Sequence, residues 1–212
     1  MIDSIMTFFK SGGTFMFPIA TIGLFAFAIV IERFIVINLH YHQIGQETRR
    51  FMSLFNSDQK SEAVHQLQVG RSLLAQTLSD AATSYEQSSV SKPMFEEMVD
   101  IHAIDSLRRL TRRTTIISTL ANVATLLGLL GTIMGLIQSF ASVAQAPGAD
   151  KSTLLSASVS VAMNTTAFGL MIAIPLLLMY VFIDNTSNKA VEKLQTSCLT
   201  ITNKLYQENT TA

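Results

Sequence analysis

Residues 114–149 read TTIISTLANVATLLGLLGTIMGLIQSFASVAQAPGA and contain no Asp, Glu, Lys or Arg. Two further stretches, 11–31 and 152–183, are equally free of charge. Each is at least as long as the roughly 20 residues that an α-helix needs to cross a hydrocarbon core of about 30 Å. The sequence therefore predicts an all-α membrane protein with three transmembrane helices and long helical cytoplasmic extensions.

The composition fits this class and excludes others. The chain has 212 residues, of which 49% are hydrophobic and only 14% charged, and its 15 basic side chains balance its 15 acidic ones. This balance gives no electrostatic reason to bind nucleic acid. One cysteine and four scattered histidines supply no metal-ligand set, and no nucleophile, base and orienting group can be placed together. We therefore expect neither a metal site nor an enzyme.

The Lys and Arg residues outside the spans predict the orientation. Residues 33–113 hold 10 of them and the tail after Asp184 holds three, whereas the N-terminal segment and the loop around Lys151 hold one each. Because basic residues stay preferentially in the cytoplasm, we expect a periplasmic N-terminus and a cytoplasmic C-terminus. The predicted segments are an outer interfacial helix (1–11), transmembrane helix 1 (12–39), a cytoplasmic helical domain (40–113), transmembrane helix 2 (114–144), a short periplasmic loop (145–153), transmembrane helix 3 (154–183) and a cytoplasmic C-terminal helix (184–212).

Two apolar patterns predict helices within the cytoplasmic part. Residues 61–82 have the spacing of a single amphipathic helix. In the tail, apolar residues step by three and four alternately, which is the spacing of a seam that packs on another helix. These tail residues are Val191, Leu194, Cys198, Ile201 and Leu205.

The second and third spans are rich in small and hydroxylated residues. In the second span a hydroxyl recurs every seven residues, at Thr125, Thr132 and Ser139, and glycines that permit close helix approach are interleaved with it. Two interpretations remain open: the hydroxyls only bond back to their own helix, or they line a polar path where oxygens replace part of an ion's hydration shell. No Asp, Glu, Lys, Arg or His lies in any of the three uncharged runs, so an ion-coupled device would need an acid from elsewhere.

The run TLLGLLGTIMG at 125–135, followed by TAFG at 166–169 and AIP at 173–175, closely resembles the MotA/TolQ/ExbB proton-channel family, nearest its ExbB and TolQ branch. The resemblance implies a homo-oligomeric ring, with a pentamer expected, in the bacterial inner (cytoplasmic) membrane. The ring would surround the single helices of two copies of an ExbD-, TolR- or MotB-like partner that carries a membrane aspartate. The assembly would convert a proton or sodium gradient into mechanical work on the cell envelope, as in biopolymer or protein transport.

The resemblance also assigns roles to residues. It places Thr132 and Thr166 in the ion path, with Thr165, Thr125 and Ser139 as further candidates, and Gly128, Gly131, Gly135, Gly169 and Pro175 in helix packing. The chain departs from the family at Val161, where the ExbB and TolQ pattern has a glutamate. The Thr165–Thr166 pair resembles sodium-driven stators, which favours sodium over the proton, and no cofactor is expected. The alternative function is a passive membrane scaffold that stabilises a partner without conducting ions.

Overall fold

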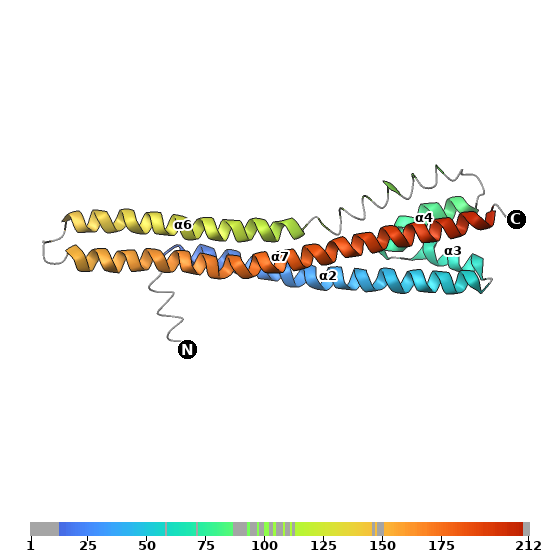
Figure 1. Ribbon diagram of the computed structural model, residues 1–212, viewed down its shortest axis with the longest axis horizontal. Helices are drawn as coiled ribbons and strands as arrows, with labels where there is room; N and C mark the ends of the chain where they lie inside the picture. Colours follow the sequence, from blue (N-terminus) through green and yellow to red (C-terminus); the bar gives the residue numbers. More distant parts are fainter. Residues whose placement is uncertain are drawn as a thin grey trace. The chain divides into compact units, whose positions relative to one another are not determined.

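The computed structural model describes residues 13–57, 59–70, 72–86, 113–145, 147 and 151–209, together with single helical residues between 93 and 111 (Figure 1). The predicted interfacial helix at 1–11 lies outside the described residues, as do residues 146 and 148–150 of the predicted loop at 145–153. The named elements are α2 (Met16–Asn56), α3 (Lys60–Val69), α4 (Leu73–Glu86), α6 (Thr114–Gln145) and α7 (Lys151–Asn209).

Three of these helices, α2, α6 and α7, are long and apolar enough to cross a membrane. The prediction of an all-α chain with three membrane-length helices is confirmed for the part of the chain that the structure describes. Two helices run further than the predicted spans: α2 continues without a break to Asn56, and α7 continues through Pro175 to Asn209. Proline in a helix removes one backbone hydrogen bond, here the one to the carbonyl of Met171, which a long membrane helix tolerates.

The chain divides into two compact units. The first comprises Met1–Glu32 and Arg113–Phe182, and the second comprises Arg33–Arg112 and Ile183–Ala212. Both α2 and α7 therefore contribute residues to each unit.

The first unit exposes many of its large apolar side chains, and it buries small ones beside a few large ones such as Met16 and Ile117. Leu24 is 74% exposed and Leu178 68%, whereas Ala121 and Ala124 are fully buried. A soluble domain hides its large apolar residues in its core. In a bilayer the lipid tails are as apolar as leucine, so the helices gain by packing small residues together and leaving the large ones in lipid. This distribution supports the assignment of α2, α6 and α7 as membrane helices.

The second unit has the opposite pattern, with large side chains inside. On α2, Ile37, Ile44 and Phe51 are buried at intervals of seven residues, the repeat of helices that pack along a seam. On α7 the predicted seam is confirmed at Leu194, Cys198, Ile201 and Leu205, all of which are buried. Val191 is only half-buried, and Ala190 is buried in its place, because the seven-residue repeat runs from Ile183 through Ala190 to Ser197.

Polar contacts also join α2 and α7 within the second unit. Thr48 Oγ1 donates to Ser197 Oγ at 2.9 Å. Lys193 Nζ donates to the Tyr41 carbonyl at 3.0 Å and lies 3.8 Å from the centre of the Tyr41 ring. Gly45 makes room for this lysine, since a Cβ there would lie 2.5 Å from Nζ. The cation is thus satisfied by a carbonyl and an aromatic face.

The single helix predicted for 61–82 is wrong, because the chain breaks between α3 and α4. Gly70 ends α3 in an extended conformation with φ −62° and ψ 139°, and its N–H donates to the Gln66 carbonyl. Ser72 then begins α4 by accepting a hydrogen bond from the Ala75 N–H at 3.0 Å. Glycine after a helix and serine before one are strong end and start signals, and here they override the continuous apolar spacing.

Cys198 is buried in the second unit. Burial, and secondarily the negative charge of Asp100, raises the pKa of its thiol to about 12 from its ordinary value of 9.0. The thiol therefore stays neutral at physiological pH and packs as a small apolar side chain, since only the thiolate is strongly nucleophilic.

Two leucines of α7 test the seam. Leu194→Ala should lower the free energy of unfolding by about 2–5 kcal/mol, because Leu194 is fully buried and the substitution leaves a cavity. Leu199→Ala is the matched control, and it should change stability by less than about 0.5 kcal/mol because Leu199 is 55% exposed. Thermal unfolding of the detergent-solubilised chain measures both, and equal losses would contradict the seam.

Candidate functional site

In the first unit α6 and α7 approach each other closely, and glycines make this contact possible. A Cβ on Gly128 would lie 3.3 Å from Thr166 Cα, and a Cβ on Gly135 would lie 2.8 Å from Ala162 Cβ. From the other side, a Cβ on Gly169 would lie 2.8 Å from the Ala124 carbonyl oxygen. Backbones at this separation leave room only for small side chains between them, the arrangement typical of small-residue membrane interfaces.

Thr166 crosses this contact with its side chain. Its Oγ1 donates a hydrogen bond to the Gly128 carbonyl at 2.8 Å, so a hydroxyl of α7 is held by the backbone of α6. The residue is half-buried, at the border of the contact. Its oxygen has given its hydrogen to a carbonyl, and it therefore presents lone pairs to any further partner.

Thr165, the neighbouring candidate, lies inside the contact. It is 2% exposed, and its Oγ1 donates to the Val161 carbonyl at 3.1 Å. Its Cγ2 methyl packs where a side chain on Gly131 would otherwise be. The two adjacent threonines are therefore in different environments: Thr165 fills the helix interface and Thr166 sits at its edge.

The three hydroxyl residues that recur every seven residues along α6 also lie in different environments. Thr125 Oγ1 donates to the Ala121 carbonyl at 3.2 Å, and Thr132 Oγ1 donates to the Leu129 carbonyl at 2.6 Å. Both are partly exposed. Ser139 is 1% exposed, and its Oγ has no hydrogen-bond partner among the described residues. Thr125 and Thr132 thus resemble Thr166, with oxygens that are free to accept.

Val161 stands where the family pattern has an acid. It lies on a different side of α7 from a polar groove near the start of this helix. Its Cγ1 is 3.5 Å from the position of a Cβ on Gly13, and eleven residues further along Ile172 packs beside Gly23 of α2. These contacts mark the α2-facing side of α7.

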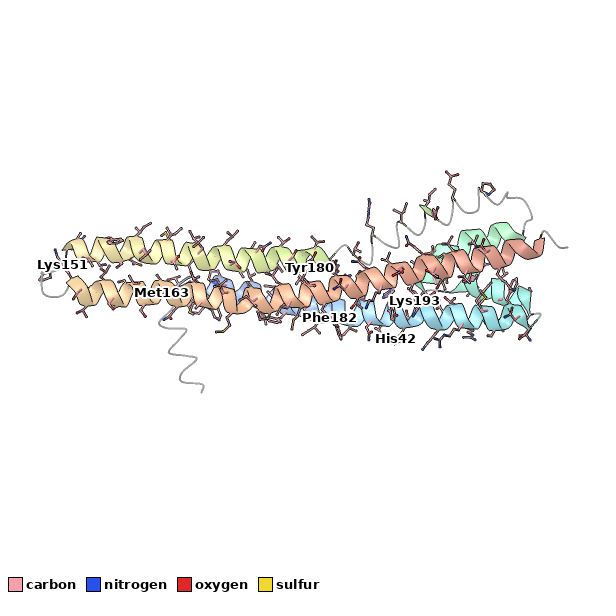
Figure 2. All side chains as sticks on the ribbon, in the orientation of Figure 1. His42, Lys151, Met163, Tyr180, Phe182 and Lys193 are labelled. Atoms are coloured by element: carbon pink, nitrogen blue, oxygen red, sulfur yellow. The ribbon has the colours of Figure 1, made fainter. Side chains whose placement is uncertain are left out.

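A polar groove runs along the early part of α7, and the sequence analysis missed it. Its hollow has a volume of about 550 Å³, and its polar lining consists of Ser152, Ser156, Ser160 and Asn164. Met163, on the membrane part of α7 in Figure 2, lies in its apolar wall. At 3.6 residues per turn, Ser156 lies about 160° around the helix from Ile172 and about 80° from Thr166. The four-residue spacing of these polar groups was the available signal.

The region that contains α6 and the first part of α7 matches a known protein family. The model of the family described as the MotA/TolQ/ExbB proton channel family matches residues 65–196. The chain belongs to this family. The matched segment contains all of α6 and the part of α7 that carries Thr165, Thr166 and the groove.

Relatives named as ExbB proteins place the chain in the ExbB-like branch of the MotA/TolQ/ExbB family. A putative biopolymer transport protein ExbB homolog of Methanothermobacter thermautotrophicus is 25% identical over 91% of this chain and 67% of its own length. A putative biopolymer transport protein ExbB-like 2 of Helicobacter pylori is 32% identical over 40% of this chain and 55% of its own length. Biopolymer transport protein ExbB of Helicobacter pylori is 31% identical over 50% of this chain and 75% of its own length. The chain thus spans between about half and three quarters of these relatives.

The glycine contact gives a stability prediction. Gly169→Ala should destabilise the first unit by roughly 1–3 kcal/mol, because the new methyl meets backbone atoms of α6 that cannot rotate away. Gly23→Ala is the matched control: the nearest atom there is Cδ1 of Ile172 at 2.9 Å, the end of a flexible side chain. We expect a lower unfolding temperature for Gly169→Ala than for Gly23→Ala in detergent, and the reverse order would refute the α6–α7 contact.

Proposed function

We propose that this chain is the ion-conducting subunit of an inner-membrane motor that uses a proton or sodium gradient to do work on the cell envelope, as in ExbB-type biopolymer transport. Membership of a proton channel family and similarity to biopolymer transport proteins of the ExbB type support this. Five copies surround the single helices of two copies of an ExbD-, TolR- or MotB-like partner, whose aspartate completes the path. A unit charge crossing the membrane supplies about 2.3 kcal/mol per 100 mV, so a few ions suffice for each mechanical step.

The proposed topology has the N-terminus in the periplasm and the C-terminus in the cytoplasm. The excess of Lys and Arg in residues 33–113 and after Asp184 supports it. The second unit, with its buried seam, is then the cytoplasmic part.

The proposed ion path follows the threonines at the edge of the α6–α7 contact. The observation that carries this proposal is the hydrogen bond from Thr166 to the Gly128 carbonyl, together with that from Thr132 to Leu129. In each case the hydroxyl hydrogen is already donated, so the oxygen offers lone pairs to a cation. Thr125 and the groove at Ser152–Asn164 extend this polar wall.

Sodium is the proposed ion. Hydroxyl and carbonyl oxygens suit a hard cation, whereas proton relays in membranes use Asp, Glu or His side chains, and α6 and residues 152–183 of α7 contain none of these three. Val161 stands where the family pattern has a glutamate, so this subunit contributes no acid of its own there.

The double substitution Thr132→Val and Thr166→Val tests the path. Valine keeps the shape and removes the oxygen, so gradient-driven flux should fall by roughly 10- to 100-fold per threonine, the effect of losing a hydrogen-bonding group next to a charge. The measurement is ion flux into vesicles that contain the chain with its partner. Thr119→Val is the matched control, because Thr119 is an exposed threonine of the same helix that also bonds to its own backbone, at the Thr115 carbonyl, but lies about 140° around α6 from Thr132.

The same variants separate conduction from the scaffold alternative. The double variant should form a complex of the same mass as the unaltered chain, measured by native mass spectrometry. Full transport by an assembled double variant would exclude conduction through these threonines and favour a passive scaffold.

Ion choice has its own test. Flux should saturate with external sodium and persist when a protonophore collapses the pH gradient, because the wall coordinates a cation and does not relay a proton. Radioactive sodium uptake and a pH-sensitive dye, recorded on the same vesicles, measure the two ions. Loss of transport on adding the protonophore under an imposed sodium gradient would identify the proton as the coupling ion.

A further inference from the structure

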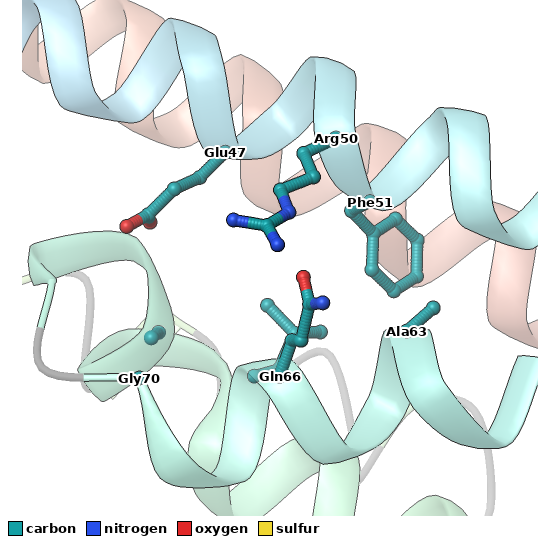
Figure 3. Close-up of a pocket in the computed structure, with 8 residues that line it drawn as sticks. Glu47, Arg50, Phe51, Ala63, Gln66 and Gly70 are labelled. Carbon is teal, nitrogen blue, oxygen red and sulfur yellow. The ribbon is translucent and has the colours of Figure 1, made fainter.

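The second unit contains a cavity of about 270 Å³ between α2, α3 and α4 (Figure 3). Its polar lining comes from Glu47, Arg50 and Gln66, and its apolar wall includes Phe51 and Leu67. Figure 3 shows the Arg50 guanidinium pointing from α2 into the cavity, toward the side-chain amide of Gln66 on α3. None of these residues belongs to the proposed ion path.

The nearby carboxylate is already engaged. Ser72 Oγ donates to Glu47 Oε2, and the same Oγ accepts the Ala75 N–H at 3.0 Å to begin α4. Glu47 is therefore tied to the start of α4. Among the residues that the structure describes, the Arg50 side chain makes no ion pair or hydrogen bond, and the Gln66 side-chain amide makes no hydrogen bond. The cavity thus presents the Arg50 guanidinium and the Gln66 amide, and neither group is hydrogen-bonded to another described residue.

We propose that this cavity binds a carboxylate carried on a short hydrocarbon stem. The two parallel N–H groups of a guanidinium match the two oxygens of a carboxylate, and the Gln66 amide adds one donor on the opposite side. Phe51 and Leu67, both buried, form a wall that removes the stem from water. The proposal concerns the second unit and is independent of ion conduction.

Charge and position argue against a phosphate or a lipid headgroup. The site has one guanidinium with the Glu47 carboxylate beside it, so a doubly charged anion would meet repulsion that a single carboxylate largely avoids. The uncharged run of α2 ends at Ile31, and Arg50 is 19 residues further on, about 28 Å along the helix. The headgroup layer extends only about 8 Å beyond the hydrocarbon on each side, so Arg50 lies beyond the reach of lipid headgroups.

The size of the cavity limits the ligand. Pockets for drug-sized molecules measure roughly 300–1,000 Å³, and this one is smaller. It accommodates either a small free carboxylic acid or one acidic side chain of a peptide with an apolar neighbour. Both sources present the same chemistry to Arg50.

Two probes test the site on the full-length chain in lipid nanodiscs by isothermal titration calorimetry. One is butyrate, which carries a single carboxylate on a short hydrocarbon stem, and the other is a capped tetrapeptide with one Glu next to one Leu. Arg50→Ala should weaken binding of the preferred probe by at least about 10-fold, because a charged hydrogen-bond partner is lost. Arg50→Lys should restore only part of the affinity, since an ammonium keeps the charge without the fork.

The neighbouring arginine provides the matched control. Arg49→Ala removes the same charge from the same helix, but Arg49 does not line the cavity, so affinity should stay within about twofold. Arg50-dependent binding of butyrate in preference to the peptide assigns a small free acid, and the opposite order assigns an acidic segment of a polypeptide. The proposal is overturned if neither probe binds, or if Arg49→Ala weakens binding as much as Arg50→Ala while unfolding temperatures are unchanged.

Discussion

The close approach of α6 and α7 is the constraint on which the chemistry of the first unit depends. Gly128 and Gly169 bring the two backbones together, and only at that separation does Thr166 Oγ1 reach the Gly128 carbonyl at 2.8 Å. In hydrocarbon an unpaired hydroxyl is costly, so a hydroxyl at this edge must bond to a carbonyl of its own or the neighbouring helix. The contact that packs the helices therefore also fixes which way the threonine oxygen faces.

The features that the sequence predicted well are local ones. Three uncharged runs predict three membrane-length helices because span length and apolarity are properties of each segment alone. The seam through Leu194 and Ile201 follows from a seven-residue repeat within one helix. The glycines of α6 predict a close contact in the same way, since a missing side chain is visible without knowing the partner.

The features that the sequence did not predict depend on contacts between distant segments. Thr165 and Thr166 are adjacent and chemically identical, yet one fills the interface and the other lies at its edge, which only the position of α6 decides. The break at Gly70 was hidden by apolar spacing that continues on both sides of it. The cavity at Arg50 forms only where α2 packs against other helices of the second unit. No pattern within one segment indicates that the Arg50 side chain will have no carboxylate partner.

The distribution of charge in the first unit supports the proposal that conduction requires a charge from a partner. A charged side chain at the centre of a membrane helix is unfavourable by roughly 2.5–3.5 kcal/mol even on permissive scales, and a free cation at that depth likewise requires compensation. Hydroxyl and carbonyl oxygens recover part of this through their dipoles, but they bring no net negative charge. Because α6 and the membrane part of α7 are uncharged, the proposed path in the isolated subunit offers a cation no compensating negative charge. An aspartate from the partner opposite Thr132 and Thr166 would supply the missing charge, so assembly itself would permit ion passage and protect the gradient from leakage through unassembled copies.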